Sequence, residues 1–248
     1  MRNILYILVF LCSSSVIGQA DFFKKGNDFY NAGNYEAAIT AYMHILKSNK
    51  HSAELYFNLA NAHYKLNHIA PSVFYYEKSL QLNPKDQDIK NNLLFSKNMT
   101  IDAIGVLPET GFSRMTKKVI HALSFDGWAT FAVVCSIVFV VLFLIYYFVE
   151  ASLLKRVLFI GSSVGFLLMI ITLIFAFNKY SIDKNNKPAI VFAKEAEIKN
   201  EPNKRGNVVF KLHEGVKVQV LDSIKNWHKI KLTDGKQGWI STKAIKRL

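Results

Sequence analysis

Residues 53–86 read AELYFNLANAHYKLNHIAPSVFYYEKSLQLNPKD, and this stretch decides the fold of the N-terminal part of the chain. The same order of small and aromatic residue types stands 34 positions earlier. The aligned pairs are Phe22 with Tyr56, Gly26 with Ala60, Phe29 with His63, Ala38 with Ser72, Tyr42 with Tyr76, and Ile45 with Ser79. A fixed period of this length is typical of stacked helix pairs, in which each pair buries its apolar face against the next. Pro84 marks the end of the second unit, because proline cannot continue a helix.

This stretch resembles the tetratricopeptide repeat family, with departures at His63, where tyrosine is usual, and at Pro71 early in the second helix. Residues 21–98 are therefore expected to form two repeats and a capping helix that carries Ile89 and Leu93. Two repeats are fewer than the roughly three that a stable array needs. We expect the array to be supported by a partner, a second copy or its own linker.

The resemblance implies that the first helix of each pair lines a concave groove that binds a protein partner. The implied groove residues are Phe23, Asn27, Tyr30, Asn31, Phe57, Asn58, Asn61 and Tyr64. Asn27 and Asn61 recur one repeat apart, as do Tyr30 and Tyr64, and paired amides and phenols suit an extended peptide. The alternative interpretation is that these side chains only pack within the repeats.

Two uncharged stretches, residues 127–149 and 157–178, predict transmembrane helices over 128–149 and 157–178, since about 20 apolar residues cross the hydrocarbon layer. Gly161 and Gly165 would let another helix approach closely, and Ala132, Cys135 and Ser136 are the facing candidates on the first span. We expect an intramolecular hairpin rather than a dimer contact.

The predicted topology places both folded domains in the periplasm of the bacterial inner (cytoplasmic) membrane. Residues 1–20 have the basic start, apolar middle and small-residue exit of a signal peptide. The predicted loop over 150–156 contains Lys155 and Arg156, which favour the cytoplasm. In the linker over 99–127, Val119, Ile120 and Leu123 predict an amphipathic helix on the membrane surface or under the repeats. A second linker is expected over 179–187.

Residues 188–248 alternate between apolar and polar residues in short runs, which predicts β-strands closed into a small all-β barrel. Asp234 and Gly235 predict a hairpin turn. The order of residues from Ile198 to Trp239 resembles the bacterial SH3-like family, although Asn200 stands where arginine is usual. The resemblance implies binding of wall peptide or protein, with Trp227 and Trp239 as recognition candidates. The alternative is that both rings pack in the core or at its rim.

Catalytic patterns such as HExxH, GxSxG or a phosphate-binding loop are absent from the sequence. The two cysteines, Cys12 and Cys135, fall in the predicted signal peptide and the first span. We therefore predict that the chain is not an enzyme and has no cofactor, metal site or nucleic-acid partner. Residues 188–248 hold 13 basic and six acidic residues, which favours an anionic neighbour or simply a soluble surface.

The complete order of segments resembles the BatE-type proteins of aerotolerance operons, with Asp102 and Ile104 in the linker as part of the likeness. That resemblance implies membrane partners with von Willebrand A domains and a link to oxidative or envelope stress. The leading interpretation is a membrane-anchored scaffold that recruits proteins through its repeats. The alternative is a cell-wall sensor whose barrel holds peptidoglycan.

Overall fold

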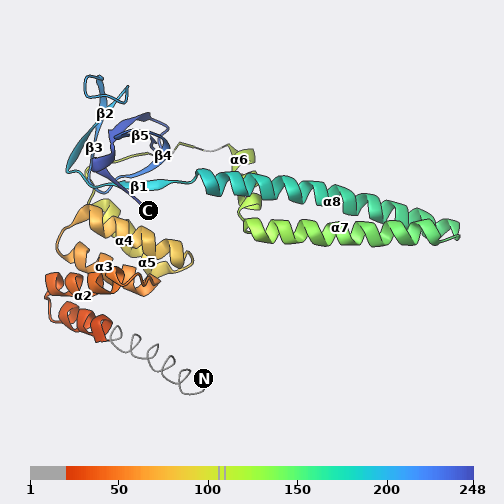
Figure 1. Ribbon diagram of the computed structural model, residues 1–248, viewed down its shortest axis with the longest axis horizontal. Coiled ribbons are helices and arrows are strands. Elements are labelled where there is room, and N and C mark those ends of the chain that lie inside the picture. Colours follow the sequence, from red (N-terminus) through yellow and green to blue (C-terminus); the bar gives the residue numbers. More distant parts are fainter. Residues whose placement is uncertain (1–20, 106, 109) are drawn as a thin grey trace, which may run out of the picture. The chain divides into compact units, whose positions relative to one another are not determined.

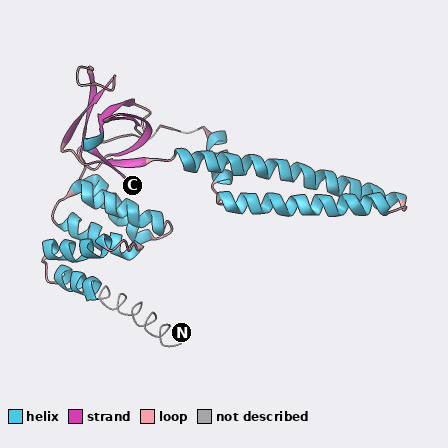
Figure 2. Ribbon diagram, viewed as in Figure 1, coloured by secondary structure: helices cyan, strands magenta, loops and turns pink. Residues whose placement is uncertain are grey.

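The computed structural model describes residues 21–105, 107–108 and 110–248, so the predicted signal peptide lies outside the described residues. They form two compact units, one made by the helical repeats with residues 187–248 and the other by residues 107–186. The predicted fold class is confirmed: helical repeats, two long apolar helices and a C-terminal antiparallel sheet (Figures 1 and 2).

The repeat region consists of successive helices that pack on their neighbours along the chain. Residues 21–31 are helical and are followed by α2 (Tyr35–Lys47), α3 (Ala53–Lys65), α4 (Ile69–Leu82) and α5 (Gln87–Asn98). Side chains at the helix starts accept backbone hydrogen bonds: Asn34 caps α2, Ser52 caps α3 and Asp86 caps α5. Such caps satisfy N–H groups that have no partner inside the helix. Helix α5 occupies the position of the predicted capping helix.

The 34-residue period corresponds to equivalent packing in the two helix pairs. Tyr42 and Tyr76, which are one period apart, are both almost fully buried. A side chain added at Gly26 would overlap the ring of Tyr42, and the aligned residue Ala60 is completely buried. Small residues thus allow each pair of helices to cross closely around a buried tyrosine.

The C-terminal sheet is antiparallel throughout, with the strand order β3-β2-β6-β5-β4-β1-β7. Its strands are β1 (Pro188–Val191), β2 (Glu195–Lys199), β3 (Val208–His213), β4 (Lys217–Ile224), β5 (Trp227–Lys231), β6 (Gln237–Ser241) and β7 (Ile245–Arg247). Gly235 adopts φ +88° in the turn between β5 and β6, a region that glycine reaches without steric cost. The predicted turn is confirmed.

Strand β1 is buried on both of its faces. Ala189 and Val191 belong to the core of the sheet, whereas Ile190 belongs to the core of the helical repeats. Side chains alternate along a strand, so one strand contributes to both cores. The repeats therefore find their support in the chain's own C-terminal domain, which was not among the expected supports.

The second unit contains α6 (Gly111–Ile120), α7 (Phe125–Phe148) and α8 (Ser152–Asn185). Helices α7 and α8 are long and apolar enough to cross a membrane. Helix α8 is longer than the predicted span over 157–178. It starts at Ser152 and continues to Asn185. Lys155 and Arg156 consequently lie in the first turns of α8 rather than in a loop, and the predicted linker over 179–187 is mostly helical.

The predicted hairpin contact between the two apolar helices is present. Ala132 and Cys135 are buried on α7, and Gly165 is buried on α8. An added Cβ at Gly165 would lie 3.6 Å from the backbone of Phe139, an ordinary van der Waals contact, so the two helices pack closely at this position. Ser136 is only partly buried.

Helix α6 ends earlier than the amphipathic helix predicted for this region. It ends at Ile120, so Leu123 lies beyond it, and its exposed apolar residues include Phe112, Met115 and Val119. The Trp128 Nε1 group of α7 donates a hydrogen bond of 3.0 Å to the Ile120 carbonyl oxygen. This bond fixes the end of α6 beside the start of α7.

Candidate functional site

A pocket of about 310 Å³ opens between the first helix of the repeats, α3 and α5. We call it the groove pocket, and it is lined by Phe23, Ala53, Glu54, Phe57, Asn58, Asn83, Asp86, Asp88 and Ile89. Of the predicted groove residues, Phe23, Phe57 and Asn58 line it. The structure thus brings one residue of the first repeat together with two residues of the second.

The other predicted groove residues do not line this pocket. Tyr30 packs edge-on against Tyr35 within the first repeat, with ring centroids 5.3 Å apart. Tyr64 is partly buried and Asn31 is exposed. Sequence reasoning missed the carboxylates of Glu54 and Asp86, because they lie outside the helix positions that the repeat pattern assigns to the groove.

The two repeated asparagines are engaged inside the repeats. Asn27 Oδ1 accepts hydrogen bonds from the Tyr42 hydroxyl at 2.8 Å and from Asn58 Nδ2 at 3.0 Å. One repeat later, the Tyr76 hydroxyl donates to Asn61 Oδ1. In both repeats the amide therefore holds the hydroxyl of the buried tyrosine. This role differs from the expected one, in which both amides were available to a peptide.

Burial also affects the titration of these two tyrosines. It raises the pKa of Tyr42 to about 12, and the nearby Tyr30 adds to the shift. Burial likewise raises the pKa of Tyr76. Both hydroxyls remain protonated near neutral pH and can donate to their asparagines.

A second cluster of polar side chains joins the helical repeats to the barrel. Glu77 of α4 has a side chain only 5% exposed, and its carboxylate lies 2.6 Å from Lys217 Nζ of β4 and 2.9 Å from Lys97 Nζ of α5. Burial opposes its ionisation, but the two ammonium groups hold the pKa of Glu77 below its usual value. The carboxylate is therefore charged at neutral pH and connects three elements.

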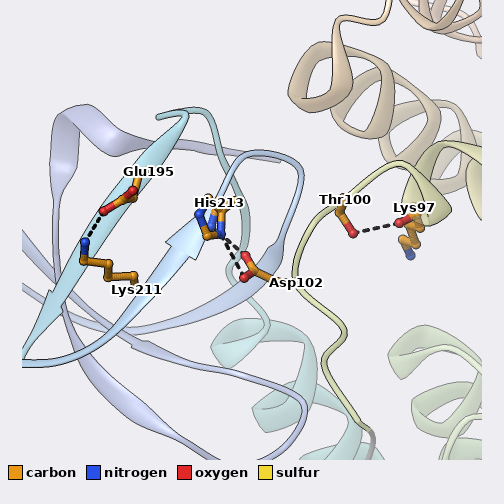
Figure 3. Close-up of polar contacts among 6 residues, drawn as sticks. All are labelled: Lys97, Thr100, Asp102, Glu195, Lys211 and His213. Atoms are coloured by element: carbon orange, nitrogen blue, oxygen red, sulfur yellow. Dashed lines mark hydrogen bonds and ion pairs between the residues drawn. The ribbon is translucent and has the colours of Figure 1, made fainter.

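The linker after α5 is fixed along the barrel by two further contacts. Asp102 accepts a hydrogen bond of 2.6 Å from the backbone N–H of His213 and lies 3.0 Å from its Nδ1 atom, as Figure 3 shows. Ile104 packs against the barrel core. The two linker residues noted in the sequence thus attach the end of the repeats to β3 and the barrel interior.

Contacts of the Phe74 ring complete the junction between α4 and the barrel. The rings of Phe74 and Phe192 pack edge-on with their centroids 5.6 Å apart, and Lys246 Nζ lies 4.5 Å from the centroid of Phe74. Gly215 adopts φ +89°, and an added Cβ would lie 2.6 Å from Thr100 Cγ2 and 2.8 Å from Ile69 Cγ2. Only glycine fits this close approach, so repeats and barrel pack as one body within their unit.

The two predicted recognition tryptophans of the barrel lie outside its apolar core. Trp227 and Trp239 are partly exposed, and neither belongs to the core cluster or to the residues packed against it. Trp239 pairs with Lys199 of β2 on one side and with Lys229 of β5 on the other. Directly opposite residues share one face of a sheet, so this indole lies between two lysines on the outer face.

Comparisons with known families give three matches. The Tetratricopeptide repeat family matches residues 53–86, a second family described as TPR repeat matches residues 26–67, and the Bacterial SH3 domain family matches residues 194–246. The chain thus combines tetratricopeptide repeats with a bacterial SH3-like domain. No curated protein matches the chain. Strand β1 lies before the region matched by the SH3 family, so the match does not include the strand whose Ile190 packs in the core of the repeats.

The matched families are typically non-catalytic interaction modules, and no catalytic family matches. Among the residues that the structure describes, no group of three or more His, Cys, Asp or Glu side chains is placed to hold a metal ion. The groove pocket and the outer face of the barrel are therefore the two candidate recognition surfaces.

Proposed function

We propose that this chain is a membrane-anchored, periplasm-facing scaffold that recruits a protein partner through the groove pocket. The proposal is carried by the pocket itself, which has aromatic side chains at Phe23 and Phe57 and remains open between three helices. Because tetratricopeptide repeats are protein-interaction modules, a protein is the ligand class that this pocket suits best. The barrel supports the recruiting surface by packing against α4.

The proposed orientation rests on the short connection between the two apolar helices. Lys155 and Arg156 lie in the first turns of α8, close to this connection, and basic residues near span ends favour the cytoplasmic side. Reporter fusions after Met99 and after Leu248 should then be active only as periplasmic reporters. Activity of a cytoplasmic reporter at either position would contradict this orientation.

The proposed partners are membrane proteins with von Willebrand A domains that act in an aerotolerance or envelope-stress complex. Support for this comes from the order of the segments, which resembles the BatE-type proteins. Partners should co-purify with the full chain in mild detergent, and Phe57→Ala should reduce the amount recovered. Phe95→Ala is a matched control, because Phe95 is 55% exposed and does not line the pocket. Equal recovery with both variants, at equal melting temperature, would refute recruitment through the groove pocket.

The alternative function, a cell-wall sensor, is favoured by the outer face of the barrel. A partly exposed indole beside Lys229, with the largely covered Lys199 on its other side, offers stacking and positive charge to an anionic wall polymer. Sedimentation of the purified chain with cell-wall sacculi tests this function. Loss of sedimentation in Trp239→Ala, with the fold intact, would support it, and unchanged sedimentation would refute a role for this face.

A further inference from the structure

The groove pocket presents hydrogen-bond acceptors and carboxylates. Among the described residues that line it, the charged ones are Glu54, Asp86 and Asp88, and none is Lys, Arg or His. The whole chain carries a formal net charge of +13, so a purely acidic lining runs against the overall composition. Charge complementarity therefore favours a cationic ligand at this position.

The amides in the lining strengthen this acceptor character. Asn58 Nδ2 donates to Asn27 Oδ1, and Asn83 Nδ2 donates to Asp86 Oδ2 at 3.2 Å. The side-chain Nδ2 groups of Asn58 and Asn83 are thus both used as donors. No described residue donates a hydrogen bond to the Oδ1 atom of either side chain. The polar atoms left for a ligand are mostly acceptors, which a donor group such as an ammonium or guanidinium would satisfy.

Two of the three carboxylates are available for such a ligand. Asp86 is occupied as the cap of α5, since it accepts hydrogen bonds from the backbone N–H groups of Asp88 and Ile89. Glu54 and Asp88 are exposed, and neither forms an ion pair with another residue that the structure describes. They can therefore pair with an incoming cation without breaking an existing contact.

The apolar part of the lining defines the rest of the ligand. Phe23 and Phe57 are partly buried rings, and aromatic faces attract ammonium and guanidinium groups. Ile89 and Ala53 add aliphatic surface that suits an apolar side chain next to the cation.

We infer that the groove pocket binds a basic segment of a partner protein, in which a Lys or Arg side chain enters between Glu54 and Asp88 beside an apolar residue. This inference rests on the proposed recruitment of a protein through the groove, and it specifies the chemistry of the recruited segment. It predicts that binding depends on the two exposed carboxylates and weakens as salt screens them.

The test uses the full chain in a neutral detergent and two fluorescein-labelled peptides of equal length. One peptide has the sequence Gly-Leu-Lys-Leu-Lys-Leu-Gly, and the other carries Glu in place of both Lys residues. Fluorescence anisotropy should show binding of the lysine peptide at least about tenfold tighter than of the glutamate peptide. Equal binding of the two peptides, or no binding of either, would overturn the inference.

The decisive variant is the double substitution Glu54→Gln with Asp88→Asn, which removes both charges and keeps the shapes. It should weaken binding of the lysine peptide about tenfold or more. The matched control is Glu36→Gln with Asp28→Asn, because both acids are exposed and lie outside the pocket. Glu36, like Glu54, occupies the first turn of its helix. The same loss of affinity in the control would overturn the assignment to the pocket.

A second measurement separates this inference from the proposed function. Partners can be co-purified from native membranes with the Glu54→Gln/Asp88→Asn variant and with Phe57→Ala. If only Phe57→Ala loses the partners, the groove recruits proteins but not through a basic segment. If neither variant loses them, recruitment through the groove is itself wrong. Loss in both variants is the result that the inference predicts.

Discussion

The buried carboxylate of Glu77 makes the junction between repeats and barrel directly testable. In Glu77→Gln the side chain keeps its shape but loses its charge, so Lys97 and Lys217 lose their shared partner. The contact with Lys217 is a hydrogen bond to a charged group, a type that contributes roughly 1.5–3 kcal/mol, whereas the contact with Lys97 is an ion pair without hydrogen-bond geometry. Both lysine side chains are about two-fifths exposed, at 41% and 42%, so water can replace much of each interaction. We therefore expect a loss of about 2 kcal/mol in the free energy of unfolding.

For a folded unit of this size, about 2 kcal/mol corresponds to a decrease of roughly 4–8 °C in melting temperature. The assay is thermal unfolding of the full chain in detergent at pH 7, combined with hydrogen exchange of peptides from α4 and β4. Exchange should increase on both sides of the junction, because the carboxylate connects the two elements. The control is Glu195→Gln, since Glu195 pairs with Lys211 on the exposed surface of the barrel (Figure 3).

The same substitution should change the dependence of stability on pH. The pKa of Glu77 is lower in the folded chain than in the unfolded chain. Its ionised form therefore stabilises the fold above the unfolded pKa, and this contribution disappears as pH falls through the folded pKa. The difference in melting temperature between the parent and Glu77→Gln should shrink below about pH 4. If Glu77→Gln melts like Glu195→Gln at pH 7, the proposed coupling is wrong.

Three further substitutions test other contacts. Gly215→Ala should lower the free energy of unfolding by about 1–3 kcal/mol, measured by chemical denaturation, because its Cβ would meet Ile69 and Thr100; an unchanged midpoint would contradict the close packing. Asn61→Ala should cost about 1–3 kcal/mol in the same assay, because it leaves the buried Tyr76 hydroxyl without its acceptor; no loss would mean that water replaces the amide. Trp239→Ala should leave the melting temperature within about 2 °C of the parent; a large decrease would show that the indole is part of the barrel core.

Much of the fold was predictable because it depends on local patterns. The 34-residue period identified the helix pairs, the uncharged stretches identified α7 and α8, and alternation identified the strands. The role of Asn27 and Asn61 was also encoded, since each stands 15 residues before the tyrosine that it holds. That spacing recurs in both repeats and is the signal that the interpretation as a peptide-binding pair overlooked.

The junction was not predictable, because its contacts join residues far apart in the sequence. Glu77 and Lys217 are separated by 140 positions, and Asp102 and His213 by 111. In the sequence, Glu77 looks like any exposed acid on a helix. The clearest hint was the run of apolar residues 189–193, since an unbroken apolar run is typical of a strand buried on both faces.

Recruitment through the groove pocket requires that this pocket contact a protein partner in the native membrane. The most direct measurement replaces Phe57 with the photoreactive residue benzoylphenylalanine, followed by irradiation of cells and analysis of the cross-linked products. The same replacement at Phe95 is the control, since Phe95 is exposed but outside the pocket. We predict a discrete cross-linked protein from position 57 and none from position 95. The same products from both positions, or no product from position 57, would contradict recruitment through the groove pocket.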